Sequence, residues 1–93
     1  MRKYELSYSS DFEIDKEKLR RSGDISALQK LAILLLELTA HPRTGTGKPE
    51  PLSNNKTGQW SRRISGKHRL IYMIDDKNAI VLLLSAYGHY DDK

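Results

Sequence analysis

The chain begins with alternating polar and apolar side chains and then changes to a helical period. Residues 3–8, KYELSY, alternate strictly, which is typical of a half-buried strand. Ser10, followed three residues later by Glu13, forms a capping-box pattern that predicts a short helix over residues 11–21. Gly23 is suited to end that helix, because glycine readily adopts a left-handed backbone.

A second, longer helix is predicted from the apolar residues that follow. Ser22 or Asp24 can cap it and Pro42 ends it. Its apolar stripe is wider than one face of a sheet should cover. This width indicates either a second apolar contact, such as a protein partner, or a deeply packed helix. The stripe consists of Leu28, Leu31, Ala32, Leu35 and Leu38, and it is widened by Ile33, Leu34 and Leu36.

The second half of the chain is rich in turns and strands. Residues 41–58 are dense in Gly, Pro, Asn and Thr, and an irregular connection of that length is usually functional or disordered. Its basic residues favour a function. Residues 59–65 and 69–74 predict a hairpin that turns around Gly66, and the apolar run 79–87 predicts a central strand covered on both faces. The order β-α-α-β-β-β predicts an α+β fold, with both helices on one face of a mainly antiparallel sheet.

Composition bounds the classes of protein that remain. The 93 residues are 38% hydrophobic and 30% charged, which suits one small folded domain over residues 1–93. There is no cysteine, which excludes a disulfide framework, a thiolate metal site and a cysteine nucleophile. Apolar runs are far shorter than the ~18 residues that span a bilayer. We therefore expect a soluble cytoplasmic protein without membrane contact.

Basic residues are concentrated in the third of the chain that contains the irregular connection and the hairpin. The net charge is +4 overall, yet residues 41–69 carry seven basic side chains against one acid, Glu50. This distribution predicts a surface that contacts phosphates, whereas the plainer interpretation is a solvated basic face. The basic residues are Arg43, Lys48, Lys56, Arg62, Arg63, Lys67 and Arg69.

The hairpin gives the sharpest geometric prediction. If the turn is centred on Gly66, Arg63 and Arg69 lie opposite each other on one face, with Cβ atoms roughly 4.5–5.5 Å apart. An anion between them would relieve their repulsion, and the arginine fork suits phosphate oxygens. A register shift of one residue would separate them. Trp60 lies on the other face and is predicted to join the core, while Arg62 either reaches phosphates or extends to solvent.

Two further residues are candidates for proton transfer. Glu50 is held between Pro49 and Pro51, whose fixed backbone pre-organises its side chain for a base, although a lone carboxylate among cations is more often an ion-pair partner. His89, followed by Tyr90, comes just after the apolar strand and titrates near neutrality, although a histidine near a chain end usually has no role.

Other candidate motifs lack the residue spacing that their functions require. Residues 45–48, GTGK, lack the spacing of a phosphate-binding loop and are followed by proline instead of Ser or Thr. His41, His68 and His89 have no spacing typical of zinc ligands. No serine lies in a nucleophile elbow. We expect no metal and no cofactor.

Residues 45–72, GTGKPEPLSNNKTGQWSRRISGKHRLIY, together with SAYGHY at 85–90, closely resemble the Txe/YoeB family of bacterial type II toxins. The resemblance implies a RelE/ParE-like fold and ribosome-dependent cleavage of mRNA, which inhibits translation. It also implies a cognate, YefM-like antitoxin as partner, the ribosome and mRNA as further partners, and is compatible with a homodimer.

The resemblance assigns roles to five positions of this sequence. Glu50 corresponds to the general base, Arg63 and Arg69 to the phosphate-binding arginines, and His89 to the acid, with Tyr90 completing the closing pair. Most members end near that pair, and three residues, DDK, extend it here. Cleavage by these groups would be a metal-free attack of the 2′-hydroxyl on phosphorus.

An alternative is a non-catalytic RNA- or protein-binding module of the same fold, which would tolerate replacement of Glu50 or His89. A DNA-binding repressor is disfavoured because no predicted helix carries the basic residues. The side chains predicted to bind RNA around the site are Lys48, Arg43, Lys56, Arg62 and Lys67.

Overall fold

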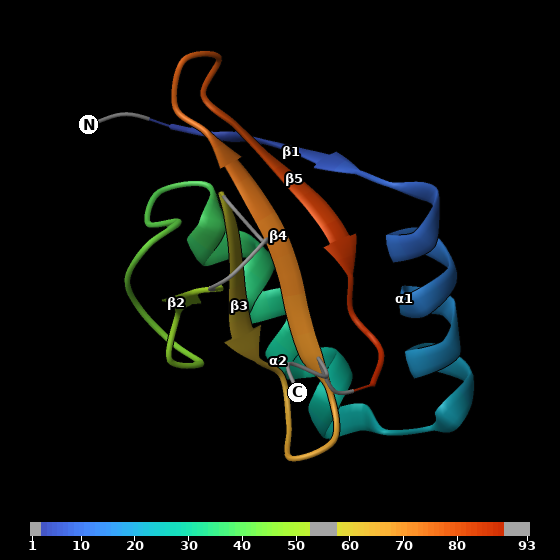
Figure 1. Cartoon of the computed structure of the whole chain (residues 1–93). Helices are drawn as coiled ribbons and strands as arrows, with labels where there is room; N and C mark the ends of the chain where they lie inside the picture. The colour runs from blue at the N-terminus through green and yellow to red at the C-terminus, as the bar shows by residue number, and fades with distance from the viewer. Residues whose placement is uncertain (1–2, 53–57, 89–93) are drawn as a thin grey trace.

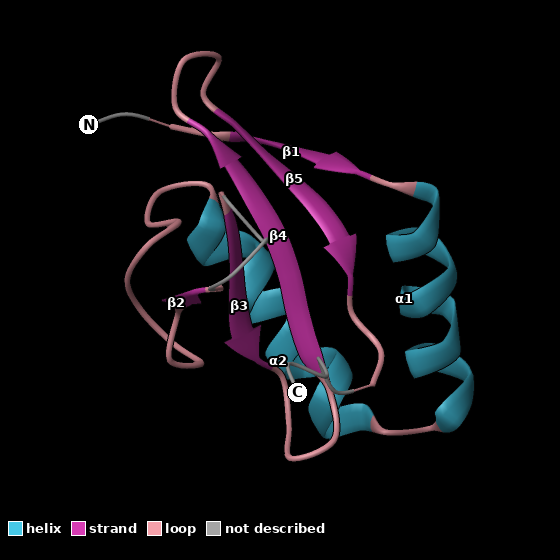
Figure 2. Ribbon diagram, viewed as in Figure 1, coloured by secondary structure: helices cyan, strands magenta, loops and turns pink. Residues whose placement is uncertain are grey.

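A five-stranded sheet carries both helices on one face (Figures 1 and 2). The structure, a computed structural model, describes residues 3–52 and 58–88. The strand order is β1-β5-β4-β3-β2, in which β1 is parallel to β5 and the other pairs are antiparallel. The elements are β1 (Glu5–Tyr8), α1 (Ser10–Ser22), α2 (Ile25–Leu38), β2 (Glu50–Pro51), β3 (Gln59–Arg63), β4 (Arg69–Asp75) and β5 (Ile80–Ser85).

The predicted α+β fold with a mainly antiparallel sheet is confirmed, with one addition to the order of elements. The connection after α2 is not wholly irregular, because Glu50 and Pro51 pair with β3 as the short edge strand β2. Proline fits there because an edge strand needs no amide hydrogen on its outer side.

The caps of the helices differ from the sequence pattern at one position. Ser9, not Ser10, caps α1, and its hydroxyl accepts the Phe12 amide hydrogen at 3.0 Å. The prediction is wrong by one residue because Ser9 and Ser10 both satisfy the side-chain preference. Gly23 ends α1 with φ 77°, and Asp24 caps α2.

Helix α2 buries one stripe and exposes another. Its fully enclosed residues are Ala27, Leu31, Leu34 and Leu38, so the stripe is centred on Leu34 and not on Ala32, which is exposed. The exposed fractions of Ile33 and Leu36 are 49% and 74%. Deep packing therefore explains Leu34 but not the other two residues that widen the stripe.

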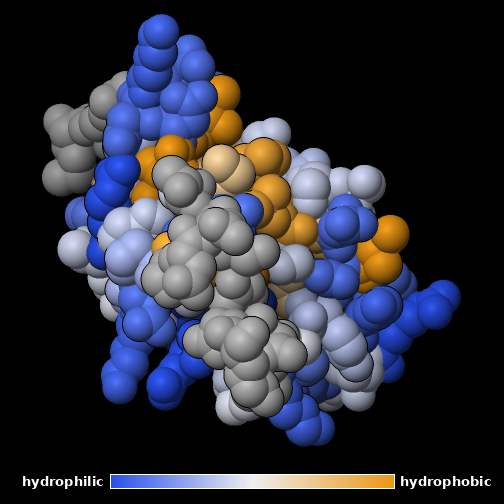
Figure 3. All heavy atoms as spheres, in the orientation of Figure 1, coloured by the Kyte–Doolittle hydropathy of each residue, from blue (hydrophilic) through white to orange (hydrophobic). Residues whose placement is uncertain are grey.

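The core lies between the helices and the inner face of the sheet. Val81 and Leu83 of β5 are fully buried there, while the alternate residues Leu82 and Leu84 are half-buried. Hydrophobic side chains gather over β4 and β5 on the sheet face seen in Figure 3. Neither helix of the described ranges is long and apolar enough to cross a membrane. Trp60 packs against the core as predicted.

Candidate active site

The hairpin of β3 and β4 places two arginines directly opposite each other. Arg63, the last residue of β3, pairs with Arg69, the first residue of β4, so the predicted same-face arrangement is confirmed. The turn between them is closed by the His68 carbonyl, which accepts the amide hydrogens of Ile64 and Ser65 at 2.9 and 3.1 Å. These hydrogen bonds close the turn next to the backbone pair Arg63 and Arg69.

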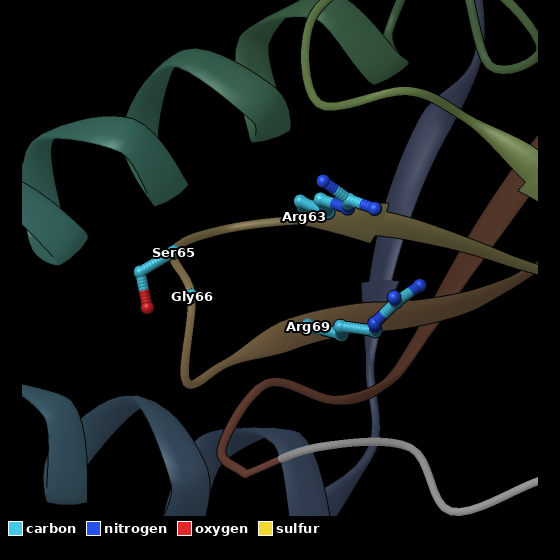
Figure 4. Close-up of a pocket in the computed structure, with 4 residues that line it drawn as sticks. All are labelled: Arg63, Ser65, Gly66 and Arg69. Atoms are coloured by element: carbon cyan, nitrogen blue, oxygen red, sulfur yellow. The ribbon is translucent and has the colours of Figure 1, made fainter.

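A small hollow lies between these arginines at the end of the hairpin. It has a volume of about 190 Å³ and is lined by Arg63, Ser65, Gly66 and Arg69. Figure 4 shows the two arginines on neighbouring strands, with Ser65 and Gly66 in the turn beside them. The Ser65 hydroxyl accepts the amide hydrogens of Lys67 and His68. Among the residues that the structure describes, the lining contains two arginines and no acid, so the hollow suits an anion such as a phosphate.

Glu50 lies at the edge of the arginine pair. Because β2 pairs with β3, Glu50 is opposite Ser61, and its Oε2 lies 3.6 Å from Nη1 of Arg69. The Glu50 side chain is 58% exposed, and an ion pair this exposed contributes under about 1 kcal/mol. The carboxylate therefore lies beside Arg69 and remains accessible to a ligand.

Arg62 has a different environment from its neighbour Arg63. Its exposed fraction is 0%, and its guanidinium donates to Glu37 at 2.8 Å and to the Tyr72 hydroxyl oxygen at 3.2 Å. It also donates to the backbone carbonyls of Thr46 at 3.3 Å, Thr44 at 2.8 Å and His41. A side chain so enclosed cannot reach RNA at the surface. We therefore correct the sequence-based assignment of Arg62 from RNA binding to a structural role.

The same cluster holds the loop that leads to Glu50. The Glu37 carboxylate accepts the Thr46 amide hydrogen at 2.8 Å and its hydroxyl hydrogen at 2.5 Å. Burial opposes ionisation of Glu37, but these hydrogen bonds and the one from Arg62 outweigh it and lower its pKa. Gly47, with φ 85°, accepts the Arg63 amide hydrogen at 2.7 Å through its carbonyl. The loop is therefore fixed to β3 just before Glu50.

Three of the remaining predicted RNA-binding residues, Arg43, Lys48 and Lys67, lie within the part of the chain that the structure describes. Lys48 and Lys67 are exposed beside β2 and in the hairpin turn. Arg43 contacts residues other than the arginine pair. Its guanidinium binds Asp76 at 2.5 Å and lies over the Trp60 ring. The predicted residues Lys56, His89 and Tyr90, and the extension 91–93, lie outside the described residues.

Sequence reasoning missed two residues that organise the site. Glu37 is the one acid in the apolar run ILLLEL of α2, which is a signal for a buried charge with a partner. His68 precedes Leu70 and Tyr72 at alternate positions, so it is expected on the core face of β4, where it needs a hydrogen-bond partner. Within residues 3–52 and 58–88, no group of three His, Asp or Glu side chains could hold a metal ion.

Comparison with known proteins shows the family to which the chain belongs. The chain is 40% identical over 70 residues to Toxin YoeB of Synechocystis, covering 75% of this chain and 79% of that toxin. A YoeB dimer from Staphylococcus aureus superposes with a TM-score of 0.80 at 31% identity, over 95% of this chain and 99% of that one. The YoeB chain of the heterotetrameric YoeB–YefM complex from the same organism superposes with a TM-score of 0.78 at 32% identity, over 94% and 98%. The family model of the YoeB-like toxin of bacterial type II toxin-antitoxin systems matches residues 10–90, and this chain belongs to that family.

Proposed function

We propose that this toxin is a ribosome-dependent endoribonuclease that cleaves mRNA and so inhibits translation. One observation carries the proposal: Arg63 and Arg69 are paired across the hairpin, with the Glu50 carboxylate beside Arg69. This arrangement supplies positive charge for a phosphate and a base at its edge. Ribosome-bound mRNA as substrate would place the activity in the cytoplasm.

The proposed reaction is a metal-free transfer within the RNA backbone. Glu50 removes the proton of a 2′-hydroxyl, and the 2′ oxygen attacks the adjacent phosphorus while Arg63 and Arg69 hold the non-bridging oxygens. The bond from phosphorus to the 5′ oxygen breaks, and His89 donates a proton to that oxygen. The products are a 2′,3′-cyclic phosphate and a 5′-hydroxyl, and Tyr90 completes the acid side of the site.

The acid and the base can be separated by the choice of leaving group. Glu50→Gln and His89→Gln should each slow the chemical step by on the order of 10² to 10⁴ while ribosome binding persists. A sulfur leaving group needs little protonation, so it should rescue His89→Gln and not Glu50→Gln. Equal rescue of both variants, or of neither, would contradict these assignments.

We further propose a cognate antitoxin whose acidic or amphipathic segment covers the basic loop and the hairpin face. The complex of YoeB with YefM supports such a partner, and the YoeB dimer supports a homodimer as a second assembly. Co-expression should yield a complex without cleavage activity. A partner that bound the helices and left cleavage intact would contradict masking.

The decisive cellular test is to induce the toxin in growing bacteria and to locate the new mRNA ends. Wild type should produce cleavage within translated regions, and co-expression of the neighbouring small gene should suppress it. The matched control is Glu50→Gln, which keeps the size of the side chain. Growth inhibition by Glu50→Gln equal to wild type, without new ends, would favour a non-catalytic binding module instead.

A further inference from the structure

Within the described residues, the segment after β5 returns to the start of β4 at Gly88. Its amide hydrogen is donated to Nδ1 of His68 at 2.8 Å, and its carbonyl accepts the amide hydrogen of Arg69 at 3.1 Å. Regular pairing of β4 with β5 ends farther back, at Ile71 and Ser85. Gly88 is therefore bound through its amide by His68 and through its carbonyl by Arg69, one of the two arginines of the candidate site.

We propose that His68 is a positioning residue for the proposed acid: its bond to Gly88 holds the backbone at the residue that precedes His89 in the sequence. This inference rests on the proposed function, in which His89 is the acid. His68 itself need not contact the substrate, because it is buried, with an exposed fraction of 7%.

Three features of the contacts among His68, Tyr87 and Gly88 favour a positioning role over simple packing. The His68 ring lies over the Tyr87 ring, with centroids 4.5 Å apart, so an apolar ring would pack there equally well. A buried imidazole costs free energy unless it is hydrogen-bonded, and Nδ1 makes that bond to the residue before His89. Gly88 has φ 87°, a turn of the backbone that other residues adopt only with strain.

Two substitutions separate the hydrogen bond from the ring. His68→Phe keeps an aromatic ring over Tyr87 but has no acceptor at the position of Nδ1. His68→Asn loses the ring, but its Oδ1 lies close to the position of Nδ1 and can accept from Gly88. The amide of Gly88 in NMR spectra reports directly whether the bond is kept, and thermal melts report folding.

The kinetic test uses single-turnover cleavage on programmed ribosomes with oxygen and sulfur leaving groups. On the oxygen substrate we expect His68→Phe to be roughly 10- to 100-fold slower at unchanged substrate affinity, since a misplacement of about 1 Å costs as much. With the sulfur substrate, His68→Phe should cleave as fast as wild type. On the oxygen substrate, His68→Asn should recover most of the wild-type rate. Combined with His89→Gln, His68→Phe should add no further loss.

The outcomes distinguish this inference from the proposed function. If His89→Gln is rescued by sulfur but His68→Phe is not, His68 does not act through the acid and this proposal is overturned. If His89→Gln itself is not rescued, the acid assignment fails and the proposal fails with it. Should His68→Phe not fold, His68→Asn and His68→Ala, which both lack the ring and differ in the acceptor, repeat the test. Equal rates for those two would likewise overturn it.

Discussion

Arg62 and Arg63 are neighbours on β3, yet they lie on opposite faces of the sheet and in opposite surroundings. Arg62 is enclosed on the helix side, where Glu37, Tyr72 and three backbone carbonyls accept its hydrogen bonds. Arg63 is exposed on the other side, opposite a second cation, Arg69. One guanidinium has its hydrogen-bonding capacity used within the protein, and the other is directed to a hollow that suits an anion.

The difference shows that a run of basic residues does not define a binding surface by itself. Successive residues of a strand point to opposite faces, so the pair RR divides into one buried structural charge and one exposed charge at the candidate site. The structural charge fixes the loop of residues 41–47, and that loop in turn brings β2 and Glu50 beside the exposed pair Arg63 and Arg69. The two faces therefore contribute to the same site in different ways.

The largest effect on stability is expected for Arg62→Met. This change leaves the Glu37 carboxylate without its cation and removes the donor to the carbonyls of Thr44 and Thr46. Breaking a fully buried pair costs about 3–5 kcal/mol, and because the Glu37 side chain is 26% exposed the loss should lie toward the lower end of that range. Chemical denaturation should detect the loss. The matched control, Arg63→Met, should change the free energy of unfolding by under about 0.5 kcal/mol, and equal losses would remove the contrast.

Substitutions of the exposed arginines should lower cleavage activity and leave stability nearly unchanged. Arg63→Ala and Arg69→Ala should each slow single-turnover cleavage by roughly 10² to 10³, as expected when a donor to the transition state is lost. Folding should be unchanged or slightly improved for Arg63→Ala, because repulsion between like charges is relieved. Arg69→Ala also loses the exposed contact with Glu50. A large fall in melting temperature in either variant would show that these arginines are structural.

The buried pair also predicts a dependence of stability on pH. The folded-state pKa of Glu37 is lowered, so its contribution is fully present above the unfolded value of about 4.3 and is lost as pH falls through the folded value. Glu37→Gln should cost about 1.5–3 kcal/mol at pH 7. Denaturation at pH 7 and pH 3 should show the gap between wild type and variant closing at the lower pH. A constant gap would contradict the assignment.

The smallest effect is expected at Arg43, a predicted RNA-binding residue whose partner, Asp76, is at the surface. Its side chain and that of Asp76 are 44% and 50% exposed, and such pairs contribute under about 1 kcal/mol. Arg43→Ala should therefore shift the unfolding midpoint only slightly. If cleavage also changes less than threefold, Arg43 lies outside the RNA-binding surface; a tenfold loss would place it within that surface.

Local periodicity predicted most of the fold. Alternation and helical spacing specified the order of elements, and the single glycine between two strand-like runs specified the register of Arg63 and Arg69. The cap was missed by one residue because Ser9 and Ser10 are adjacent and chemically equivalent. Strand β2 was missed because its two residues form a strand only through their pairing with β3.

The site was predictable where it depends on neighbouring strands and not where it depends on distant contacts. The partner of Arg62 is Glu37, 25 positions away, and no local pattern connects the two. Likewise, the bond between His68 and Gly88 joins residues 20 positions apart. Alternation along β4 predicts that His68 is buried, but only the folded chain identifies what it binds.

The central claim, attack by a 2′-hydroxyl at a site formed by Glu50, Arg63 and Arg69, is tested most directly by the chemistry of the cut ends. A labelled mRNA is cleaved by the toxin on programmed ribosomes, and both new termini are identified by mass spectrometry. We predict a 2′,3′-cyclic phosphate or its opened product on one fragment and a 5′-hydroxyl on the other. A 3′-hydroxyl together with a 5′-phosphate would contradict the account, because those ends require attack by an external nucleophile.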